Sequence, residues 1–272
     1  MDSSPQSVGN KELITSEDEM LVAFLRERNL DKTNEYDKQR PVRVADGIYA
    51  RYVKRILDLV IAVPAFIITL PLNCVFGIFT FFDVGKPILY RQTRIGKGGR
   101  PFVMIKFRNM NNKKDESGNL LPAAQRVTKF GHIMRKYSFD ELLNFWSVIK
   151  GDMSIIGPRP LPEFFVNRMS DRHKLRAAVR PGLECPVEIP TGTDLSPFHW
   201  KFEKDVWYVE NISFKTDVKM MFELIKMTLD MKTRGRHADG LTYFIGYDDD
   251  LRPIGLILAR NLYKSVREKE HE

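Results

Sequence analysis

The order of apolar and polar positions places one long hydrophobic segment between shorter amphipathic ones. Residues 59–82 are 24 consecutive positions without a charged side chain, and most of them are Ile, Val, Leu or Phe. A straight helix of this length reaches about 36 Å at about 1.5 Å per residue, enough to cross a hydrocarbon core of about 30 Å. The segment is therefore a candidate for a membrane-inserted helix.

Two features of this segment favour a helix that enters the membrane and returns to the same side. Pro64 and Pro71 remove backbone donors, and Pro71 divides the run into halves that are too short to cross alone. Both flanks are basic, and positive charge marks the cytoplasmic side. We predict a re-entrant helix broken at Pro71; a straight span and a buried soluble helix are the alternatives. The basic flanks contain Arg51, Lys54, Arg55, Lys86, Arg91, Arg94, Lys97 and Arg100.

The shorter patterns predict a helix near the start of the chain and a hairpin after the apolar segment. Ser16 and Glu19 form an S-x-x-E capping pattern, and apolar residues follow at helical spacing, so we expect an amphipathic helix over residues 17–29. Residues 88–92 and 102–107 have strand-like composition and flank a glycine-rich basic turn. This arrangement predicts a β-hairpin.

Near the end of the chain, residues 254–272 predict a basic amphipathic helix that docks on the body rather than anchoring independently in a membrane. The apolar side of this helix is expected to carry Ile257, Leu258, Leu262 and Val266. The polar segment that precedes it contains three consecutive aspartates, which we expect in a solvated turn at residues 248–250.

Composition narrows the class of protein. The chain has 272 residues, 43% hydrophobic, with 43 Lys+Arg against 35 Asp+Glu, which indicates one soluble domain or one domain with extensions. A polytopic membrane protein, a disordered chain and a disulfide scaffold are excluded, the last because there are only 2 cysteines. Residues 51–110 hold 10 basic and 2 acidic residues beside the apolar run. This block favours anionic lipid headgroups or phosphate substrates, and no recognised nucleic-acid-binding motif is present.

An acidic pair follows in a segment that predicts the start of a helix. Ser138 would be the N-cap and Glu141 the third helical residue, as in a capping box. First-turn acids often only complement the helix dipole. The same positive helix end would keep Asp140 ionised and nucleophilic, and the adjacent carboxylates of Asp140 and Glu141 are candidate Mg²⁺ ligands. Both interpretations stay open at this point.

Two arginines lie in stiff, proline-rich settings that suit phosphate binding. Arg159 lies between two prolines, and Arg180 precedes Pro181. Lys106 and Arg108 are expected on the same face of a strand, where they either neutralise a phosphate or line a solvated surface.

Taken together, the motifs resemble those of the bacterial sugar transferases known as monotopic phosphoglycosyl transferases, over about residues 50–230. They are K-R-x-x-D at 54–58, K-F-R-N-M at 106–110, S-F-D-E-L at 138–142, K-G-D-M-S-I-I-G-P-R-P at 150–160, V-R-P-G at 179–182 and D-V-W-Y-V at 205–209. The resemblance implies transfer of a sugar-1-phosphate from a UDP-sugar to polyprenyl (undecaprenyl) phosphate, with release of UMP. It also implies a monotopic protein at the cytoplasmic face of the bacterial inner membrane, where it would initiate assembly of a lipid-linked glycan.

The same resemblance assigns roles to individual residues. Asp140 would be the nucleophile that forms a covalent phosphosugar intermediate, and Glu141 would help it to hold Mg²⁺. Arg159 and Arg180 would contact phosphate, with Lys106 and Arg108 as companions.

The chain departs from the family pattern after V-R-P-G. Glu184 and Cys185 stand where Thr-Gly is expected, and Thr193 stands near the position of an expected arginine. These changes predict altered donor contacts; the alternative is a weakened or non-catalytic family member that acts as a membrane-surface scaffold. The sequence does not specify the sugar or the pathway.

The predicted organisation is a helix-rich α+β body with one membrane helix. An acidic extension covers residues 1–48, the re-entrant helix 49–84, the catalytic domain 85–232 and a second extension 233–272. The extensions are candidate surfaces for self-association or for pathway partners.

Overall fold

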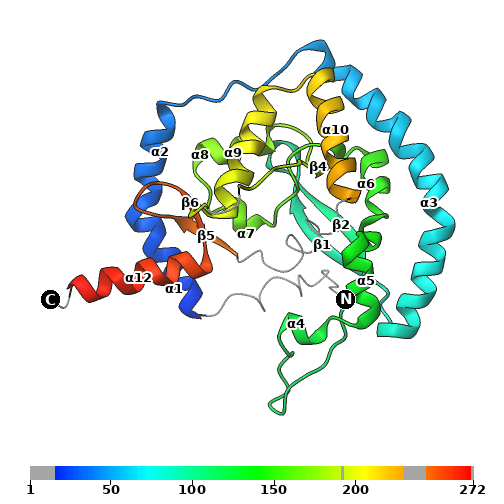
Figure 1. Cartoon of the computed structure of the whole chain (residues 1–272), viewed down its shortest axis with the longest axis horizontal. Helices are drawn as coiled ribbons and strands as arrows, with labels where there is room; N and C mark the ends of the chain where they lie inside the picture. Colours follow the sequence, from blue (N-terminus) through cyan, green and yellow to red (C-terminus); the bar gives the residue numbers. More distant parts are fainter. Residues whose placement is uncertain (1–15, 191–192, 230–242, 271–272) are drawn as a thin grey trace, which may run out of the picture.

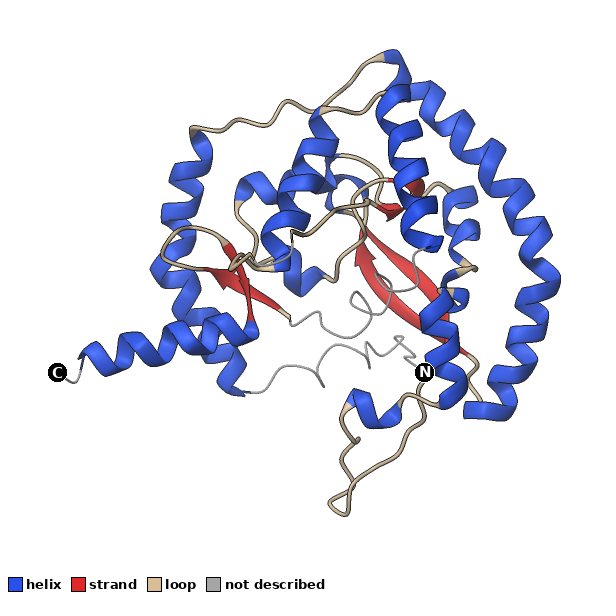
Figure 2. Ribbon diagram, in the orientation of Figure 1, coloured by secondary structure: helices blue, strands red, loops and turns tan. Residues whose placement is uncertain are grey.

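The computed structural model describes residues 16–190, 193–229 and 243–270. In these residues, helices surround three two-stranded sheets (Figures 1 and 2). The arrangement is helix-rich α+β, as the sequence predicts. The predicted boundary between residues 232 and 233 lies outside the described residues.

The helical elements are α1 (Ser16–Leu25), η1 (Arg26–Leu30), α2 (Asp31–Lys38), η2 (Tyr49–Val53), α3 (Lys54–Val84), η3 (Lys97–Gly99), α4 (Ala123–Arg126), α5 (Lys129–Tyr137), η4 (Phe139–Glu141), α6 (Asn144–Lys150), α7 (Glu163–Val166), α8 (Asp171–Lys174), η5 (Leu175–Ala178), α9 (Pro197–Glu210), α10 (Phe214–Leu229) and α12 (Leu256–Glu270). The strands are β1 (Leu89–Ile95), β2 (Pro101–Phe107), β3 (Ser154–Ile156), β4 (Gly182–Glu184), β5 (Phe244–Tyr247) and β6 (Pro253–Gly255).

Helix α3 is the long apolar element, and it curves along one side of the body (Figure 1). Tyr49–Val84 is long and apolar enough to cross a membrane, and only 11% of its most apolar window is buried. This exposure argues against a buried soluble helix. Helical conformation continues through Pro64 and Pro71, so the predicted break at Pro71 is not confirmed.

The few polar residues of α3 face the body. The Asp58 carboxylate accepts hydrogen bonds from Ser154 Oγ at 2.9 Å and from the Ile155 amide at 3.0 Å. Further along the helix, the Phe76 ring stacks on Phe139, with ring centroids 4.9 Å apart. These contacts attach α3 to the start of β3 and to the turn that carries the acidic pair.

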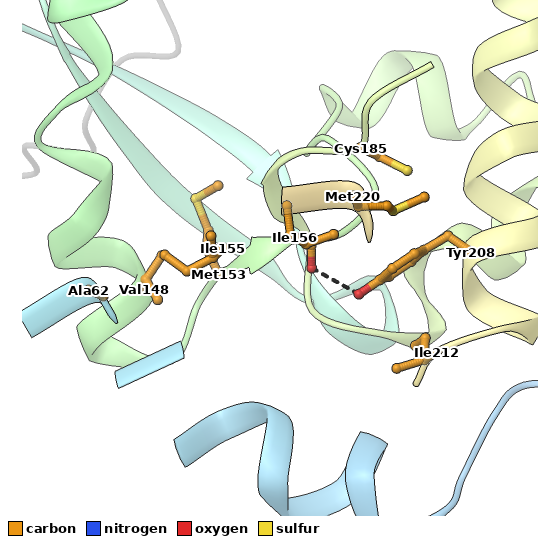
Figure 3. Packing of buried hydrophobic residues seen from close by; sticks show 9 residues of the cluster. All are labelled: Ala62, Val148, Met153, Ile155, Ile156, Cys185, Tyr208, Ile212 and Met220. Carbon is orange, nitrogen blue, oxygen red and sulfur yellow. Dashed lines mark hydrogen bonds between the residues drawn. The ribbon is translucent and has the colours of Figure 1, made fainter. Parts of the chain in front are cut away.

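The main core lies between α6, the short parallel β3–β4 pair, and helices α9 and α10 (Figure 3). Tyr208 is fully buried here, and its hydroxyl donates to the Ile156 carbonyl at 3.1 Å and contacts Asp217 at 2.7 Å. Burying one large apolar side chain contributes about 1.5–3 kcal/mol. The buried members of the cluster are Ala62, Val148, Met153, Ile155, Ile156, Cys185, Tyr208, Ile212 and Met220.

The predicted hairpin is confirmed as the antiparallel pair β1–β2. Its register joins Leu89 to Phe107 and Ile95 to Pro101, and the turn between the strands is η3. Phe107 is buried, whereas the side chain of Lys106 reaches toward the acidic pair. The hairpin therefore carries one wall of the site described below.

The segments that flank this body pack against each other. Arg28 donates to the Asp249 carboxylate from Nε at 2.7 Å and from Nη2 at 3.0 Å. Arg260 donates to Asp18 at 2.9 Å. Leu25 is buried against β5 and β6. In Figure 1 these elements lie together at the left. The turn at residues 248–250 is thus tied to η1 and is not purely solvated.

The predicted terminal helices form with two corrections. The early helix continues past residue 29 through η1 and α2, because Asn29 is buried and its side chain donates to the Tyr247 carbonyl at 3.0 Å. Helix α12 docks through Ala259 and Leu262, whereas Ile257 and Leu258 are exposed, contrary to the predicted apolar side.

Candidate active site

The acidic pair lies in a tight turn, and Ser138 does not cap a helix as predicted. Ser138 ends α5 in the left-handed conformation, with φ 57°, and α6 begins only at Asn144. Between them, Phe139 stacks on Phe76 and on Tyr137. Asp140 belongs to the short turn η4, which follows the left-handed Ser138, and the predicted stabilisation by a helix end does not apply.

Asp140 is buried, with 6% of its surface exposed, and its environment opposes ionisation. Burial raises its pKa to about 6, and the neighbouring Glu141 adds to the shift, while Lys106 and Arg135 lower it. Asn109 Nδ2 donates to Oδ2 of Asp140 at 3.1 Å. The carboxylate is thus held by nearby cations and an amide instead of a helix end.

Glu141 is firmly ionised. Its Oε1 accepts from Lys106 Nζ and from Arg159 Nη2, each at 2.5 Å. Burial alone would raise the Glu141 pKa, but Arg159 and Lys106 together lower it to about 2. The turn therefore presents one readily protonated carboxyl group beside one that is fixed as an anion.

Arg159 is positioned by a close crossing of two backbone segments. A Cβ on Gly182 would lie 2.1 Å from the Gly157 nitrogen, so only glycine permits this approach. The Arg176 side chain donates to the Arg159 carbonyl at 2.8 Å. At the other end of the side chain, Arg159 Nη1 donates to Glu184 at 3.0 Å. The Arg159 guanidinium thus bridges Glu141 and Glu184.

The other two predicted phosphate contacts lie elsewhere. Arg108 donates to the carbonyls of Val84 and Gly85 at the end of α3. Arg180 donates to the Gly151 carbonyl at 3.1 Å and lines a separate cavity of about 170 Å³ with Lys54 and Asp58 among others. Of the four predicted basic residues, the described contacts bring Lys106 and Arg159 to the acidic pair.

The structure adds three residues that the sequence prediction did not assign to this site: Asn109, Arg135 and Arg94. Glu184, which was predicted to alter donor contacts, lies here as well. Arg94 approaches because the Ile95 amide donates to the Leu161 carbonyl at 2.9 Å, beside the Arg159 loop. Burial and repulsion from Arg159 lower the Arg94 pKa to about 10. The motif K-F-R-N-M contained the signal for Asn109, and the departure after V-R-P-G contained the signal for Glu184, whereas only folding brings Arg135 into place.

The donor set is compatible with Mg²⁺, which binds oxygen and often takes one or two protein carboxylates plus substrate phosphates. Asp140 and Glu141 supply adjacent carboxylates beside the cations Lys106 and Arg159. A site made entirely of protein ligands is not found in the described residues, where no group of three or more His, Cys, Asp or Glu is arranged for a metal. A metal here would therefore be coordinated by a bound phosphate as well as by the protein carboxylates.

Comparison with known proteins identifies the family. A family model described as Bacterial sugar transferase matches residues 49–231. The chain belongs to the bacterial sugar transferase family. This membership confirms the motif resemblance and the predicted enzyme class, the phosphoglycosyl transferases.

Individual relatives of this bacterial sugar transferase differ in length. The uncharacterized sugar transferase EpsL of Bacillus subtilis (strain 168) is 38% identical over 181 residues, 65% of this chain and 87% of that protein. The UDP-N-acetylgalactosamine-undecaprenyl-phosphate N-acetylgalactosaminephosphotransferase of Aeromonas hydrophila is 34% identical, over 67% of this chain and 44% of its own length. The UDP-glucose:undecaprenyl-phosphate glucose-1-phosphate transferase of Escherichia coli (strain K12) is 32% identical, over 63% and 39%. The chain thus spans less than half of the latter two proteins.

Proposed function

We propose that this bacterial sugar transferase moves a sugar-1-phosphate from a UDP-sugar to polyprenyl phosphate and releases UMP, as the first step in assembly of a lipid-linked glycan. The observation that carries the proposal is the buried Asp140 next to Glu141 and two cations, in a turn that stacks on the long apolar helix α3. A reactive site beside an apolar helix of this kind suits a lipid acceptor. The names of the relatives support the lipid phosphate and the nucleotide-sugar donor.

The reaction proceeds in two displacements at one phosphorus. An oxygen of Asp140 attacks the sugar-bearing phosphorus, the bond from this phosphorus to UMP breaks, and UMP leaves. An oxygen of polyprenyl phosphate then attacks the same phosphorus, and the bond to Asp140 breaks. The carboxylate is restored, and the product is a polyprenyl diphosphosugar.

The surrounding residues bind and orient the charged groups. Arg159 is half-buried and keeps part of its guanidinium exposed, so it contacts the donor phosphates while Glu141 holds it in place. Lys106 adds a second positive charge at the same Glu141 oxygen, Oε1. Mg²⁺ bound by Asp140 and Glu141 would neutralise charge on the donor diphosphate. Arg108 and Arg180 remain predicted phosphate contacts for a substrate-bound state.

For the membrane, we propose a monotopic arrangement at the cytoplasmic face of the inner membrane, with α3 entering and leaving on one side. The basic residues on both flanks of α3 support this topology. Helix α10 supports contact with the membrane surface, since it exposes Phe214, Val218, Phe222 and Ile225 together with lysines. Cysteine labelling near Lys54 and near Lys97 tests the topology: both sites should react from the cytoplasm, and opposite sides would establish a bitopic helix.

The competing proposal is a scaffold that keeps the fold without catalysis. The observation in its favour is that Glu184 accepts a hydrogen bond from Nη1 of the Arg159 guanidinium, which is then not available to a phosphate. Incubation of the purified protein with Mg²⁺, polyprenyl phosphate and a panel of radiolabelled UDP-sugars separates the two proposals. The enzyme releases UMP and forms a labelled lipid with at least one donor; no product across the panel would support the scaffold.

The nucleophile has its own test within this assay. Asp140→Asn should abolish both turnover and the labelled protein adduct that forms with donor alone, because an amide does not displace UMP. Asp31→Asn, an exposed aspartate on α2, is the matched control and should retain both. Normal turnover of Asp140→Asn would reject the covalent mechanism.

A further inference from the structure

One side chain links the Asp140 carboxylate to helix α5. Asn109, just after β2, is 9% exposed and donates from Nδ2 to Oδ2 of Asp140 at 3.1 Å. Its other amide atom, Oδ1, accepts from Arg135 Nη2 at 2.9 Å. Arg135, Asn109 and Asp140 therefore form a continuous hydrogen-bonded row.

The order of this row fixes the orientation of the Asn109 amide. An arginine side chain has donors and no acceptor, so only the amide oxygen of Asn109 can face Arg135. The NH₂ group must then point toward Asp140, where an ionised carboxylate offers only acceptors. Arg135 thus acts on Asp140 through the amide as well as through its charge.

The backbone of Asn109 also packs closely against the start of helix α5. A Cβ on Gly131 would lie 2.2 Å from the Asn109 carbonyl oxygen, so α5 touches the chain at this point. Thr128 Oγ1 caps the start of α5 by accepting from the Gly131 amide at 2.8 Å, and the Thr128 amide donates to the Asn109 carbonyl at 3.3 Å. The start of α5 therefore contacts the main chain of Asn109, and Arg135 on the same helix binds the Asn109 side chain.

We propose that Asn109 is a positioning residue, which holds the Asp140 carboxylate in the orientation for attack on the donor phosphorus, and that Arg135 fixes the Asn109 amide for this task. The inference rests on the proposed function. Asp140 lies in a turn of only three residues between two helices, so its rotamer depends on contacts from outside the turn. A displacement of about 1 Å at a reacting group costs about 100-fold in rate.

Kinetics on the full-length protein in lipid nanodiscs test this role. Asn109→Ala should lower kcat and the single-turnover rate of adduct formation by about 10- to 100-fold. The donor KM should change by less than about twofold, because Asn109 contacts the nucleophile and not the donor. Asn112→Ala, an exposed asparagine three positions later, is the matched control and should behave as wild type.

A double-mutant cycle separates positioning from general support of the fold. Arg135→Met should slow wild type by at least about fivefold but have a smaller effect in Asn109→Ala, since the two residues act in series. Multiplicative losses would overturn the link between them. If Asn109→Ala does not fold, as judged by its thermal midpoint, Asn109→Ser replaces it, with the same expectation of a slower first step.

The outcomes distinguish this inference from the proposed function. An active wild type with unchanged kcat in Asn109→Ala overturns the positioning role and leaves the function intact. A rise in donor KM of more than fivefold with unchanged kcat also overturns it, because Asn109 would then contact the donor. Wild type that is inactive with every UDP-sugar rejects the function, and the positioning role with it.

Discussion

Arg159 and Glu184 form an ion pair inside the candidate active site, with 3.0 Å between Nη1 and Oε2. The pair involves the residue that replaces the threonine expected from the family pattern. Under the proposed function, its carboxylate would compete with donor phosphate for the same guanidinium. Glu184 lies on β4 next to the Gly157–Gly182 crossing, and this close backbone packing limits movement of Glu184 away from Arg159.

The first prediction follows from this competition. Glu184→Gln removes one negative charge beside the donor phosphates, and the donor KM should fall by about three- to tenfold, which corresponds to about 1 kcal/mol. kcat should stay within about twofold, because the nucleophile is untouched. Steady-state kinetics with varied UDP-sugar measure both. Glu188→Gln, an exposed change in the same loop, is the control, and a higher KM in Glu184→Gln would contradict the competition.

The second prediction concerns the stability cost of Asp140, the proposed nucleophile. The Asp140 pKa is raised from 3.8 to about 6, so the folded state binds this proton more tightly than the unfolded state. The contribution of Asp140 to the free energy of unfolding should therefore fall as pH rises from about 4 to about 6 and stay lower above it. Asp140→Asn removes this penalty and should stabilise the metal-free protein by about 1–3 kcal/mol at pH 8.

Urea denaturation in EDTA at about pH 4 and pH 8 measures the effect, and the gain should nearly vanish at the lower pH. Asp31→Asn, the exposed control, should change stability by less than about 0.5 kcal/mol at either pH. Destabilisation by Asp140→Asn at pH 8 would contradict the burial argument.

The third prediction concerns the support of Arg159. Arg176 and Asp205 form a buried pair at 2.6 Å, with 6% and 7% of their side chains exposed, and Arg176 also binds the Arg159 carbonyl. Arg176→Met leaves the Asp205 charge buried and should destabilise the fold by about 3–5 kcal/mol. Adding Asp205→Leu should restore most of this stability. Thermal denaturation of both variants checks the order, and equal stability of the single and double variants would contradict it.

The fourth prediction tests whether the early helix is an integral part of the fold. Leu25 is 1% exposed against β5 and β6, so Leu25→Ala should cost about 2–5 kcal/mol. Met20→Ala, on the same helix with 59% exposure, should change stability by less than about 0.5 kcal/mol. Both are measured by chemical denaturation. A loss in Leu25→Ala no larger than that in Met20→Ala would show that α1 packs only loosely.

The sequence predicted the elements whose signals are local. The hairpin β1–β2, the apolar helix and the adjacency of Asp140 and Glu141 all follow from runs of a few residues. The predicted N-cap at Ser138 was wrong for a tertiary reason, since the capping pattern is present but Phe139 stacks on Phe76 instead of continuing a helix. Packing between segments that are distant in the sequence overrode the local preference for a helix start.

Contacts between distant segments explain the remaining differences at the site. Arg159 and Lys106 were predicted as phosphate contacts, and the motifs did not predict that both bind Glu141. Glu184 was predicted to alter donor contacts, and it binds Arg159. Arg135 enters through the packing of α5, which no short motif encodes. Arg108 was predicted from strand alternation, yet β2 ends at Phe107 and the arginine turns to the carbonyls at the end of α3. Alternation predicts a face only while the strand continues.

The contact between Asp18 and Arg260 joins residues 242 positions apart, and this separation sets an order of events during synthesis. On the ribosome, α1 is made long before β5, β6 and α12, so its apolar side emerges without its partners. Helix α3 also emerges within that interval. In the proposed membrane arrangement, insertion of α3 would begin while the early helix is still uncovered. A ribosome stalled before residue 243 would then hold a nascent chain with Leu21 and Leu25 accessible to chaperones.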